Sequence, residues 1–353
     1  MSRSEDPKLF EQRKKDHIRW SLDQQSQVGL SPSEQVRLIH DPLPEVNFKD
    51  IKVETASKVL TNSKPLMVSS MTGGHKDSYE INKILMQACS NKNWAFATGS
   101  LRKELEQVSA ESSDDEWTVL NNEFGKSLDL IGNIGIAQVI SHETEDFKKL
   151  VSRYGLKGLY VHLNPLQEVI QPEGTTDFSG GVEAIKRLQE TLEIPVFLKE
   201  TGTGFSKSTF EKVKGLNLPA VDVSGFGGTH WGRIEGLRSK EDSMFDKASR
   251  VFADWGVTTV ESLQAGEKVL EGSLTELWAS GGLRSGLDAA ICFALGARVC
   301  GFAGPMMQAA LEGVEAVEEL MDQIEYELRI ALFCTGTCSI NKLNKEKVLE
   351  YGT

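Results

Sequence analysis

Long apolar runs are missing from this chain, and so is an excess of basic charge. No stretch of its 353 residues approaches the length that crosses a bilayer, and the charged amino terminus lacks the pattern of a signal peptide. Acidic residues number 51 against 39 lysines and arginines, which gives a formal net charge of −12. This balance argues against a general role on nucleic acids or membrane surfaces. We therefore expect a cytoplasmic protein, with neither nucleic acid nor membrane as a partner, that binds anions in a local basic pocket.

Two signatures of other protein classes are also absent. The five cysteines are an odd, scattered set, and Cys334 and Cys338, four apart, have no further cysteine or histidine near them in sequence. A zinc site is therefore not expected, and Cys292 and Cys300 fit core packing instead. The G-x-G-x-x-G fingerprint of dinucleotide-binding sheets does not follow the first predicted strand. The usual start of a doubly wound fold is thus missing.

Short apolar runs alternate with helix-length intervals along most of the chain. Because these runs do not alternate apolar with polar residues, they are typical of strands covered on both faces. Eight are predicted, over residues 65–70, 95–98, 128–131, 158–162, 195–198, 220–223, 274–279 and 298–302. Their number and order predict an α/β protein, a (β/α)8 TIM barrel. We place the barrel at residues 65–353, with its C-terminal helical tail, behind an N-terminal extension at residues 1–64; a doubly wound sheet is the alternative.

The tail has apolar residues at helical spacing from Val314 to Phe333. That apolar face can pack either on its own barrel or on a neighbouring subunit. The sequence leaves both arrangements open.

The stretch from Leu274 to Pro305 has the pattern of one β-α-β unit with glycines at both strand exits. Ser285 and Asp288 have the spacing of a capping box, and Gly296 is placed to end the helix. Backbone N–H groups beside glycines at helix N-termini attract phosphate, and Arg284 adds a full charge. Paired exits with an arginine favour a phosphate site over glycines that only permit tight turns.

Polar residues stand at or just past the ends of the predicted strands, where a barrel builds its active site. Lysine and histidine are not turn-forming residues, so their presence there favours a site over ordinary turns. The set is Thr72, Ser100, Asn133, His162, Asn164, Lys199, Ser224, Arg284 and Gly304.

Two of these strand ends suggest specific chemistry. Glu168 follows His162 and Asn164 and is the kind of oxygen ligand that Mg²⁺ takes together with phosphate and water, although an exposed loop glutamate is the alternative. Lys199 leaves a buried strand, which is costly without a counter-charge. An electron-rich cofactor would supply that charge; a Schiff base or a simple pair with Glu200 are the alternatives.

Two further segments are candidates for covering the site. Arg13 and His17 lie four residues apart, with Lys14 beside them, and form either a solvated helix face or an arm that closes over an anion. The glycine-rich turn before Thr229 is followed by a long polar stretch to about Trp255, which is typical of a lid. His230 could act as a base, but nothing in the sequence orients it.

Seven motifs together resemble the type 2, flavin-dependent isopentenyl diphosphate isomerase family. They occur in the family's order and span most of the chain. They are Arg13-Lys14-x-x-His17, Ser70-Met71-Thr72-Gly73-Gly74, Gly132-Asn133-Ile134-Gly135, His162-x-Asn164-x-x-Gln167-Glu168, Lys199-Glu200-x-Gly202-x-Gly204-x-Ser206, Asp222-Val223-Ser224-Gly225-x-Gly227-Gly228-Thr229 and Ser280-Gly281-Gly282-x-Arg284.

The resemblance implies a barrel that binds FMN, active in its reduced form with NADPH as reductant, and Mg²⁺. It implies an isomerase of isoprenoid biosynthesis that interconverts isopentenyl and dimethylallyl diphosphate, a small-molecule substrate, and that forms a homotetramer or homo-octamer. Because no carboxylate pair is placed for acid–base work, the flavin itself would move the protons while Lys199 balances its charge.

The resemblance also implies residue roles. The catalytic positions are Gln167, beside the allylic carbons, and His162, and Glu168 holds the metal. The substrate is bound by Arg13, Lys14, His17, Arg102, His162, Asn164 and Gln167. The flavin is bound by Met71, Thr72, Gly73, Ser100, Asn133, Lys199, Ser224 and Thr229, and its phosphate by Gly281, Gly282, Arg284, Ala303 and Gly304.

The sequence departs from the family pattern at two positions, and it leaves two other functions open as alternatives. Leu101 replaces a glutamine before Arg102, and His230 replaces a small polar residue after Thr229. An FMN-dependent 2-hydroxy acid oxidase would use His230 and Arg233 to hold a carboxylate. A catalytically inactive flavin-binding protein is the third reading.

Overall fold

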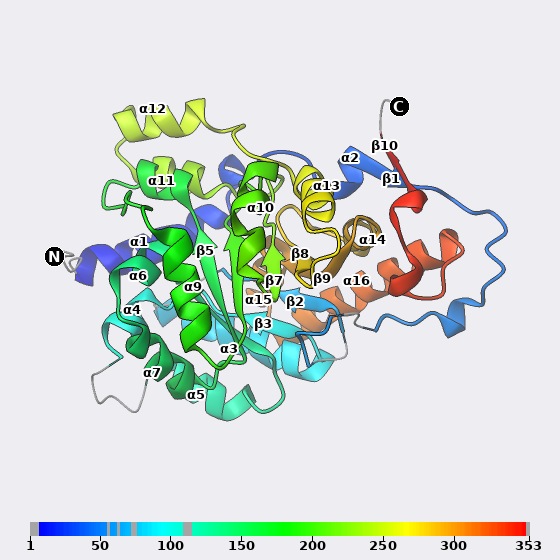
Figure 1. Ribbon diagram of the computed structural model, residues 1–353, viewed down its shortest axis with the longest axis horizontal. Coiled ribbons are helices and arrows are strands. Elements are labelled where there is room, and N and C mark those ends of the chain that lie inside the picture. The colour runs from blue at the N-terminus through cyan, green and yellow to red at the C-terminus, as the bar shows by residue number, and fades with distance from the viewer. Residues whose placement is uncertain (1–6, 55–56, 62–63, 72–75, 109–114, 351–353) are drawn as a thin grey trace.

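Eight parallel strands close into a barrel in the described part of the chain (Figure 1). The computed structural model describes residues 7–54, 57–61, 64–71, 76–108 and 115–350. The strands pair in sequential order, and β9 closes on β2. They are β2 (Leu66–Val68), β3 (Ala95–Ala97), β4 (Leu130–Gly135), β5 (Gly158–Leu163), β6 (Val196–Glu200), β7 (Ala220–Asp222), β8 (Glu276–Ala279) and β9 (Ala297–Phe302). The predicted (β/α)8 barrel is confirmed.

Helices follow the strands and cover the outside of the barrel (Figure 1). Their apolar faces and the outward-facing strand residues form one continuous core. They are α3 (Lys76–Lys92), α4 (Arg102–Glu106), α5 (Glu116–Phe124), α6 (Ile136–Ser141), α7 (Thr144–Tyr154), α8 (Pro165–Ile170), α9 (Gly181–Thr191), α10 (Lys207–Val213), α11 (Trp231–Arg238), α12 (Met244–Val251), α13 (Thr259–Val269), α14 (Gly286–Ala294), α15 (Gly304–Ala310) and α16 (Val314–Cys334).

Side chains fill the interior of the barrel rather than leaving a pore. Tyr160, Phe197 and Trp278 pack against one another, with ring centroids 4.9 to 6.1 Å apart. Such tilted and edge-on contacts are the arrangements that aromatic rings prefer. This packed floor forces any ligand to bind at an end of the barrel.

The predicted strand ends are accurate at most positions, but β4 is longer than expected. Sequence predicted an exit at Gly132, whereas the strand continues to Gly135 and pairs Asn133 with Tyr160 of β5. Cβ atoms at Gly132 and Gly135 would collide with the side chains of Leu156 and Gln138. The glycines therefore allow close packing inside the strand.

The β8–α14–β9 unit follows its predicted pattern. Ser285 caps α14, and both hydrogen bonds of the capping box with Asp288 are present. Leu287, in the first turn of α14, is 43% exposed. The helix turns this position outward and buries Asp288, which also accepts from the Arg284 N–H.

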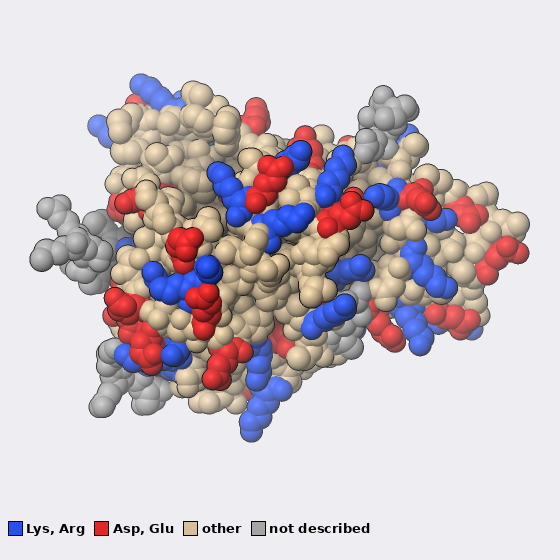
Figure 2. Space-filling model, in the orientation of Figure 1, with Lys and Arg blue, Asp and Glu red and all other residues tan. Residues whose placement is uncertain are grey.

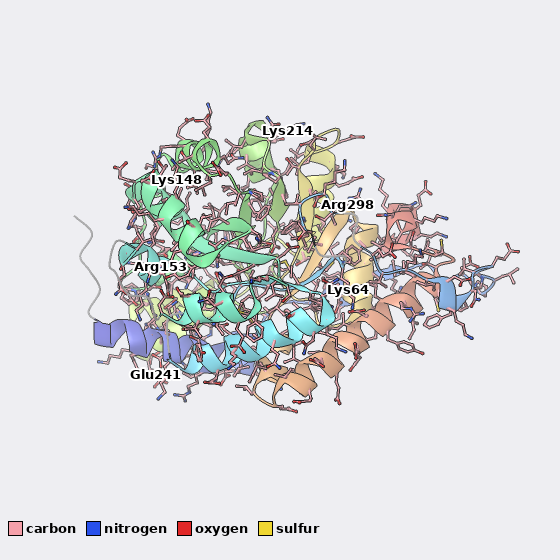
Figure 3. All side chains as sticks on the ribbon, turned by 90° about the horizontal axis from the view of Figure 1, so that it is seen from below. Lys64, Lys148, Arg153, Lys214, Glu241 and Arg298 are labelled. Atoms are coloured by element: carbon pink, nitrogen blue, oxygen red, sulfur yellow. The ribbon has the colours of Figure 1, made fainter. Side chains whose placement is uncertain are left out.

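The C-terminal helix α16 packs on its own barrel. Its apolar residues at helical spacing are buried, and the helix lies against α14 and α3, as Figure 3 shows for α3. Lys64 and Trp94 both bond Glu325 on α16 (2.6 and 2.8 Å). This settles the open choice between its own barrel and a neighbour for that face.

The N-terminal extension contains several short elements of regular structure. It contains α1 (Pro7–Ser21), α2 (Pro32–Gln35), β1 (Val36–Leu38) and the 3-10 turns η1 (Gln24–Ser26) and η2 (Phe48–Asp50). β1 pairs antiparallel with β10 (Val348–Glu350), so residues near the two ends of the chain meet in one small sheet (Figure 1). Three further 3-10 turns are η3 (Lys214–Leu216), η4 (Ile340–Lys342) and η5 (Lys345–Lys347).

No helix in the described ranges is long and apolar enough to cross a membrane. Positive and negative side chains are interspersed on the face seen in Figure 2, without a large area of one sign.

Candidate active site

A pocket opens at the carboxyl ends of the barrel strands and is covered by α1. Every predicted site residue within the described part of the chain lines it. These are Arg13, Lys14, His17, Met71, Ser100, Arg102, Asn133, His162, Asn164, Gln167, Glu168, Lys199, Ser224, Thr229, Gly281, Gly282, Arg284, Ala303 and Gly304. Thr72 and Gly73 lie outside the described residues. Parallel strands deliver their ends to one rim, which is why residues so distant in sequence meet.

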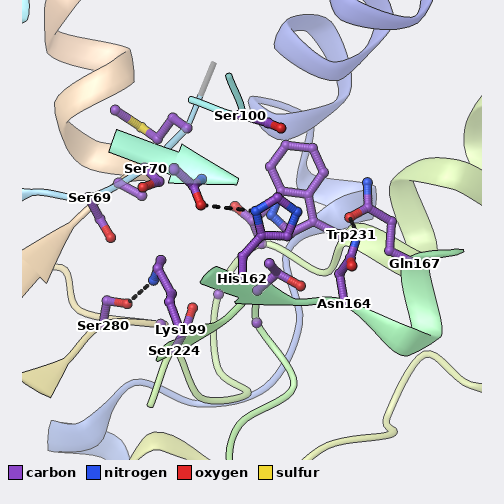
Figure 4. Close-up of a pocket in the computed structure, with 18 of the residues that line it drawn as sticks. Ser69, Ser70, Ser100, His162, Asn164, Gln167, Lys199, Ser224, Trp231 and Ser280 are labelled. Carbon is purple, nitrogen blue, oxygen red and sulfur yellow. Dashed lines mark hydrogen bonds between the residues drawn. The ribbon is translucent and has the colours of Figure 1, made fainter. Parts of the chain in front are cut away.

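The wall of the pocket at β4 and β5 is built around His162. Its Nδ1 lies 2.9 Å from Asn133 Oδ1, and this contact is the dashed line drawn at His162 in Figure 4. Desolvation, reinforced by the positive charges of Lys14 and Lys199, lowers the pKa of His162 to about 3. The ring is therefore neutral near pH 7, and with Nδ1–H donating to Asn133 its Nε2 is left to accept a hydrogen bond.

The β5–α8 turn holds the amides of Asn164 and Gln167, which lie side by side in Figure 4, and the carboxylate of Glu168. Asn164 Nδ2 donates to Gln167 Oε1 and to Glu168 Oε1, both at 3.0 Å. Thr175 N donates to the other carboxylate oxygen of Glu168 at 2.5 Å. Pro165 opens α8 here, so the following residues turn back toward Asn164. Both oxygens of Glu168 are thus oriented before any ligand binds.

Glu235 on α11 is a central residue of the site that sequence reasoning missed. It is fully buried and accepts from Gln167 Nε2 (3.0 Å), from His17 Nε2 (2.8 Å) and from Arg238. Burial opposes its ionisation, but His17 and Arg238 outweigh that effect and lower the pKa of Glu235 to about 2. Burial likewise lowers the pKa of His17, and Glu235 offsets only part of that shift. A neutral His17 therefore donates to an ionised Glu235.

The N-terminal helix α1 closes over the pocket of its own chain. Arg13 and Lys14 are only 5% and 9% exposed, so the alternative of a solvated face is wrong for both. Arg13 approaches Glu173 at 3.8 Å, and Gln171, with its amide oriented to suit both neighbours, links Arg13 to Glu235. The cationic face of α1 is thereby directed inward.

Lys199 finds its counter-charge on the next strand rather than on Glu200. Its ammonium lies 2.9 Å from Asp222 Oδ2 and 2.7 Å from Ser280 Oγ. Glu200 instead accepts from Thr203 Oγ1 (2.7 Å) and from backbone N–H groups of its own loop, including that of Gly204 (3.0 Å). The register of β6 and β7 pairs Lys199 with Asp222 directly, which sequence alone did not reveal.

The glycine turn after β8 has a backbone that only glycine adopts freely. Gly281 and Gly282 have φ angles of 91° and 76°, and a Cβ at either would lie within 2.5 Å of a backbone carbonyl oxygen of Gly225 or Gly227. Both glycines line the pocket, and neither position tolerates a side chain. Arg284 borders it and bonds Glu34 Oε2 at 3.2 Å. A glycine turn beside an arginine is an arrangement that commonly binds anions.

The two departures noted in the sequence have separate explanations. Leu101 is fully buried in the core outside the barrel and does not line the pocket. Its side chain therefore makes no contact in the pocket. His230 is the N-cap of α11, where its Nδ1 accepts from Arg233 N at 2.9 Å. Burial lowers the pKa of His230, which keeps the ring neutral and able to accept that bond.

Fold and pocket place the chain in a class of flavin-binding barrels. It matches the family model of FMN-dependent dehydrogenases over residues 162–350. Its fold is that of the flavin-binding domain of baker's yeast flavocytochrome b2 (TM-score 0.65, 15% identity, 95% of this chain and 79% of that one). It is also that of a mandelate oxidase (TM-score 0.62, 14% identity, 97% and 95%). At these identities the likeness concerns the fold alone.

Within that class the chain belongs to the isopentenyl-diphosphate delta-isomerase family. It is 42% identical to the isopentenyl-diphosphate delta-isomerase of Bdellovibrio bacteriovorus over 97% of this chain and 98% of that one. The enzyme of the same name from Legionella pneumophila (strain Corby) is 44% identical over 96% and 97%. That of Halobacterium salinarum is 35% identical over 99% and 96%. The resemblance suggested by the seven motifs is confirmed.

Proposed function

We propose that this protein interconverts isopentenyl and dimethylallyl diphosphate, using reduced FMN and Mg²⁺. The observation that carries the proposal is one pocket with two kinds of anion site. Arg13 and Lys14 on the inward face of α1 line it, and so does the glycine turn at Gly281 and Gly282. A site for two separate phosphate groups suits a phosphorylated cofactor and a diphosphate substrate bound together.

In this proposal the chain's own residues bind and orient, and the bound flavin supplies the groups that give and take the protons. Arg13, Lys14, His17 and Arg102 bind the diphosphate, and α1 excludes water from the site. Gln167 lies where its amide is fixed from both sides, by Asn164 and by Glu235. A fixed amide orients the allylic unit without acting as an acid or a base.

Glu168 is the proposed Mg²⁺ ligand. No group of three or more histidine, cysteine or acidic side chains suited to a metal occurs in the described ranges. In this proposal phosphate oxygens and water would therefore complete the coordination shell of the ion. We expect Glu168→Gln to raise the Mg²⁺ concentration for half-maximal activity by about tenfold or more. Glu183→Gln, an exposed glutamate on α9, is the matched control. An unchanged Mg²⁺ titration in the Glu168 variant would remove this residue from the proposed metal site.

The function is tested by following conversion of isopentenyl diphosphate with FMN and Mg²⁺ present. Turnover is expected after reduction of the flavin with NADPH or dithionite, with none when the flavin stays oxidised. Equal turnover in both states would rule out a role for reduced flavin. Sedimentation velocity on the same sample tests the proposed homotetramer or homo-octamer.

The competing 2-hydroxy acid oxidase activity has poor support in the site. His230 and Arg233 would have to hold the substrate carboxylate, yet neither lines the pocket. His230 caps α11, and Arg233 bonds Ser249 Oγ (2.9 Å) and Asp246 (3.3 Å). Oxygen uptake with 2-hydroxy acids is therefore expected to be absent.

A further inference from the structure

Three buried polar side chains form a closed hydrogen-bonded triangle beneath the pocket. Lys199 donates to Asp222 Oδ2 (2.9 Å) and to Ser280 Oγ (2.7 Å), and Ser280 donates to Asp222 Oδ1 (2.8 Å). All three are at most 4% exposed. They come from β6, β7 and the end of β8, and Figure 4 shows Lys199 and Ser280 at the pocket floor.

The triangle leaves one N–H group of the Lys199 ammonium free to donate into the pocket. Two of its three N–H groups have acceptors in Asp222 and Ser280, and Lys199 lines the pocket. The remaining N–H is the one available to a bound ligand. Asp222 also accepts from Ser224 N (3.2 Å), and Tyr160 OH lies 3.5 Å from its Oδ2. The carboxylate is thus anchored on its own strand, and the lysine is oriented by it.

The charges in the triangle cancel. Lys199 carries one positive charge and Asp222 one negative charge, and Ser280 is neutral, so the group contributes no net charge to the pocket floor. Away from bulk water an uncompensated ammonium would attract a nearby anion strongly. Compensation reduces that attraction and leaves a directed N–H donor.

We propose that Asp222 is a positioning residue that neutralises Lys199 and so limits the preference of the site for the anionic form of reduced FMN. The inference rests on the proposed binding of FMN in this pocket. Reduced FMN loses a ring proton near neutral pH, and a bare cation beside it would favour the deprotonated form. A neutral pair lets the reduced flavin keep its proton, as acid–base work requires.

The test compares the affinity of the protein for oxidised and for reduced FMN. Both dissociation constants are measured, the second under dithionite, for the wild type, Asp222→Asn, Lys199→Gln and the double variant. The dissociation constant for oxidised FMN divided by that for reduced FMN is expected to rise about tenfold or more in Asp222→Asn, because this variant keeps the cation without its carboxylate. This ratio is expected to fall by a similar factor in Lys199→Gln, because that variant keeps the carboxylate without its cation.

The double variant is the decisive comparison. It carries no charge in the triangle, so its ratio is expected near the wild-type value. If Lys199 acted alone, Asp222→Asn would leave the ratio unchanged and the double variant would equal Lys199→Gln; either result overturns the proposal. Each tenfold change in the ratio is equivalent to about 30 mV in the two-electron midpoint potential, which a redox titration checks independently.

A matched control separates local from overall charge. Asp129 is also a buried aspartate, but it precedes β4 at the opposite end of the barrel and accepts from Thr61 N at 2.7 Å. Asp129→Asn changes the net charge by the same amount and is expected to leave the ratio unchanged. A ratio that shifts equally in both variants would contradict the proposal.

Two other outcomes remain distinct. If Asp222→Asn does not fold, the comparison of Lys199→Gln with the double variant still decides the question, because restoration of the ratio requires Asp222 to act through charge. If the wild type binds no FMN, the proposed function fails and not this inference alone.

Discussion

At the scale of single residues, Glu235 links α1 to the pocket wall at α8. One buried carboxylate contacts His17 on α1, Gln167 on α8 and Arg238 on α11. We expect Glu235→Gln to lower kcat/KM and to reduce the free energy of unfolding by about 3 kcal/mol near pH 7, because it leaves Arg238 without its buried anionic partner. Chemical denaturation and steady-state kinetics measure the two effects.

The same residue gives a prediction for pH. The pKa of Glu235 falls from 4.5 to about 2 on folding, so its stabilising contribution is present above about pH 4.5 and is lost as the pH falls toward 2. Over that window the wild type should lose about 3 kcal/mol that Glu235→Gln does not lose. The free energy of unfolding of both proteins is measured between about pH 2 and 5. If it falls equally in both, the neighbours of Glu235 do not lower its pKa.

Glu235 also shows why some site residues escape sequence reasoning. It lies in the stretch read as a polar lid, and no motif marks it. Its burial depends on His17, 218 positions away, and on the packing of α1 against α11. Asp222 stood inside a recognised motif, but its role required the register between β6 and β7. Residue type and local spacing contain neither piece of information.

At the scale of elements, the orientation of α1 decides which of its charges matter. Lys14 is buried against the pocket, whereas Lys15, its neighbour, is exposed. We expect Lys14→Ala to raise the KM for isopentenyl diphosphate by about tenfold or more, since a charge-assisted hydrogen bond to the diphosphate is lost. Lys15→Ala is the control and should leave KM unchanged. Equal effects would mean that α1 acts through its overall charge.

The prediction of helices and strands succeeded where the local sequence pattern was strong. All eight barrel strands were predicted because parallel strands covered on both faces read as uninterrupted apolar runs. The stretch from Trp231 to about Trp255, predicted as a polar lid, forms α11 and α12, and α11 buries Ile234 and Glu235. Its polar composition concealed the helices because they bury polar side chains in ion pairs, such as that of Arg233 with Asp246.

At the scale of the whole molecule, the two ends of the chain support each other away from the pocket. β1 pairs with β10, and Ile39 N donates to Lys347 O at 2.8 Å. Removal of residues 345–353 should therefore lower stability by about 2 kcal/mol, through a few lost backbone hydrogen bonds. Thermal unfolding measures the effect, and FMN affinity should be unchanged. A chain shortened only to residue 350 is the control, and loss of FMN binding in the longer truncation would contradict this separation of end pairing from the site.

The amino-acid sequence by itself determined the barrel, its strand order and the polar residues at the strand ends, because each depends on local pattern: apolar runs, capping residues and glycine turns. Only the tertiary structure decided which of those polar residues are paired, which charges are compensated and that α1 closes the pocket of its own chain. Ion pairs such as Lys199 with Asp222, and the burial of Glu235, depend on distances between segments far apart in sequence. Those distances exist only after the barrel has closed and packed, and they are what convert a set of polar residues into a site.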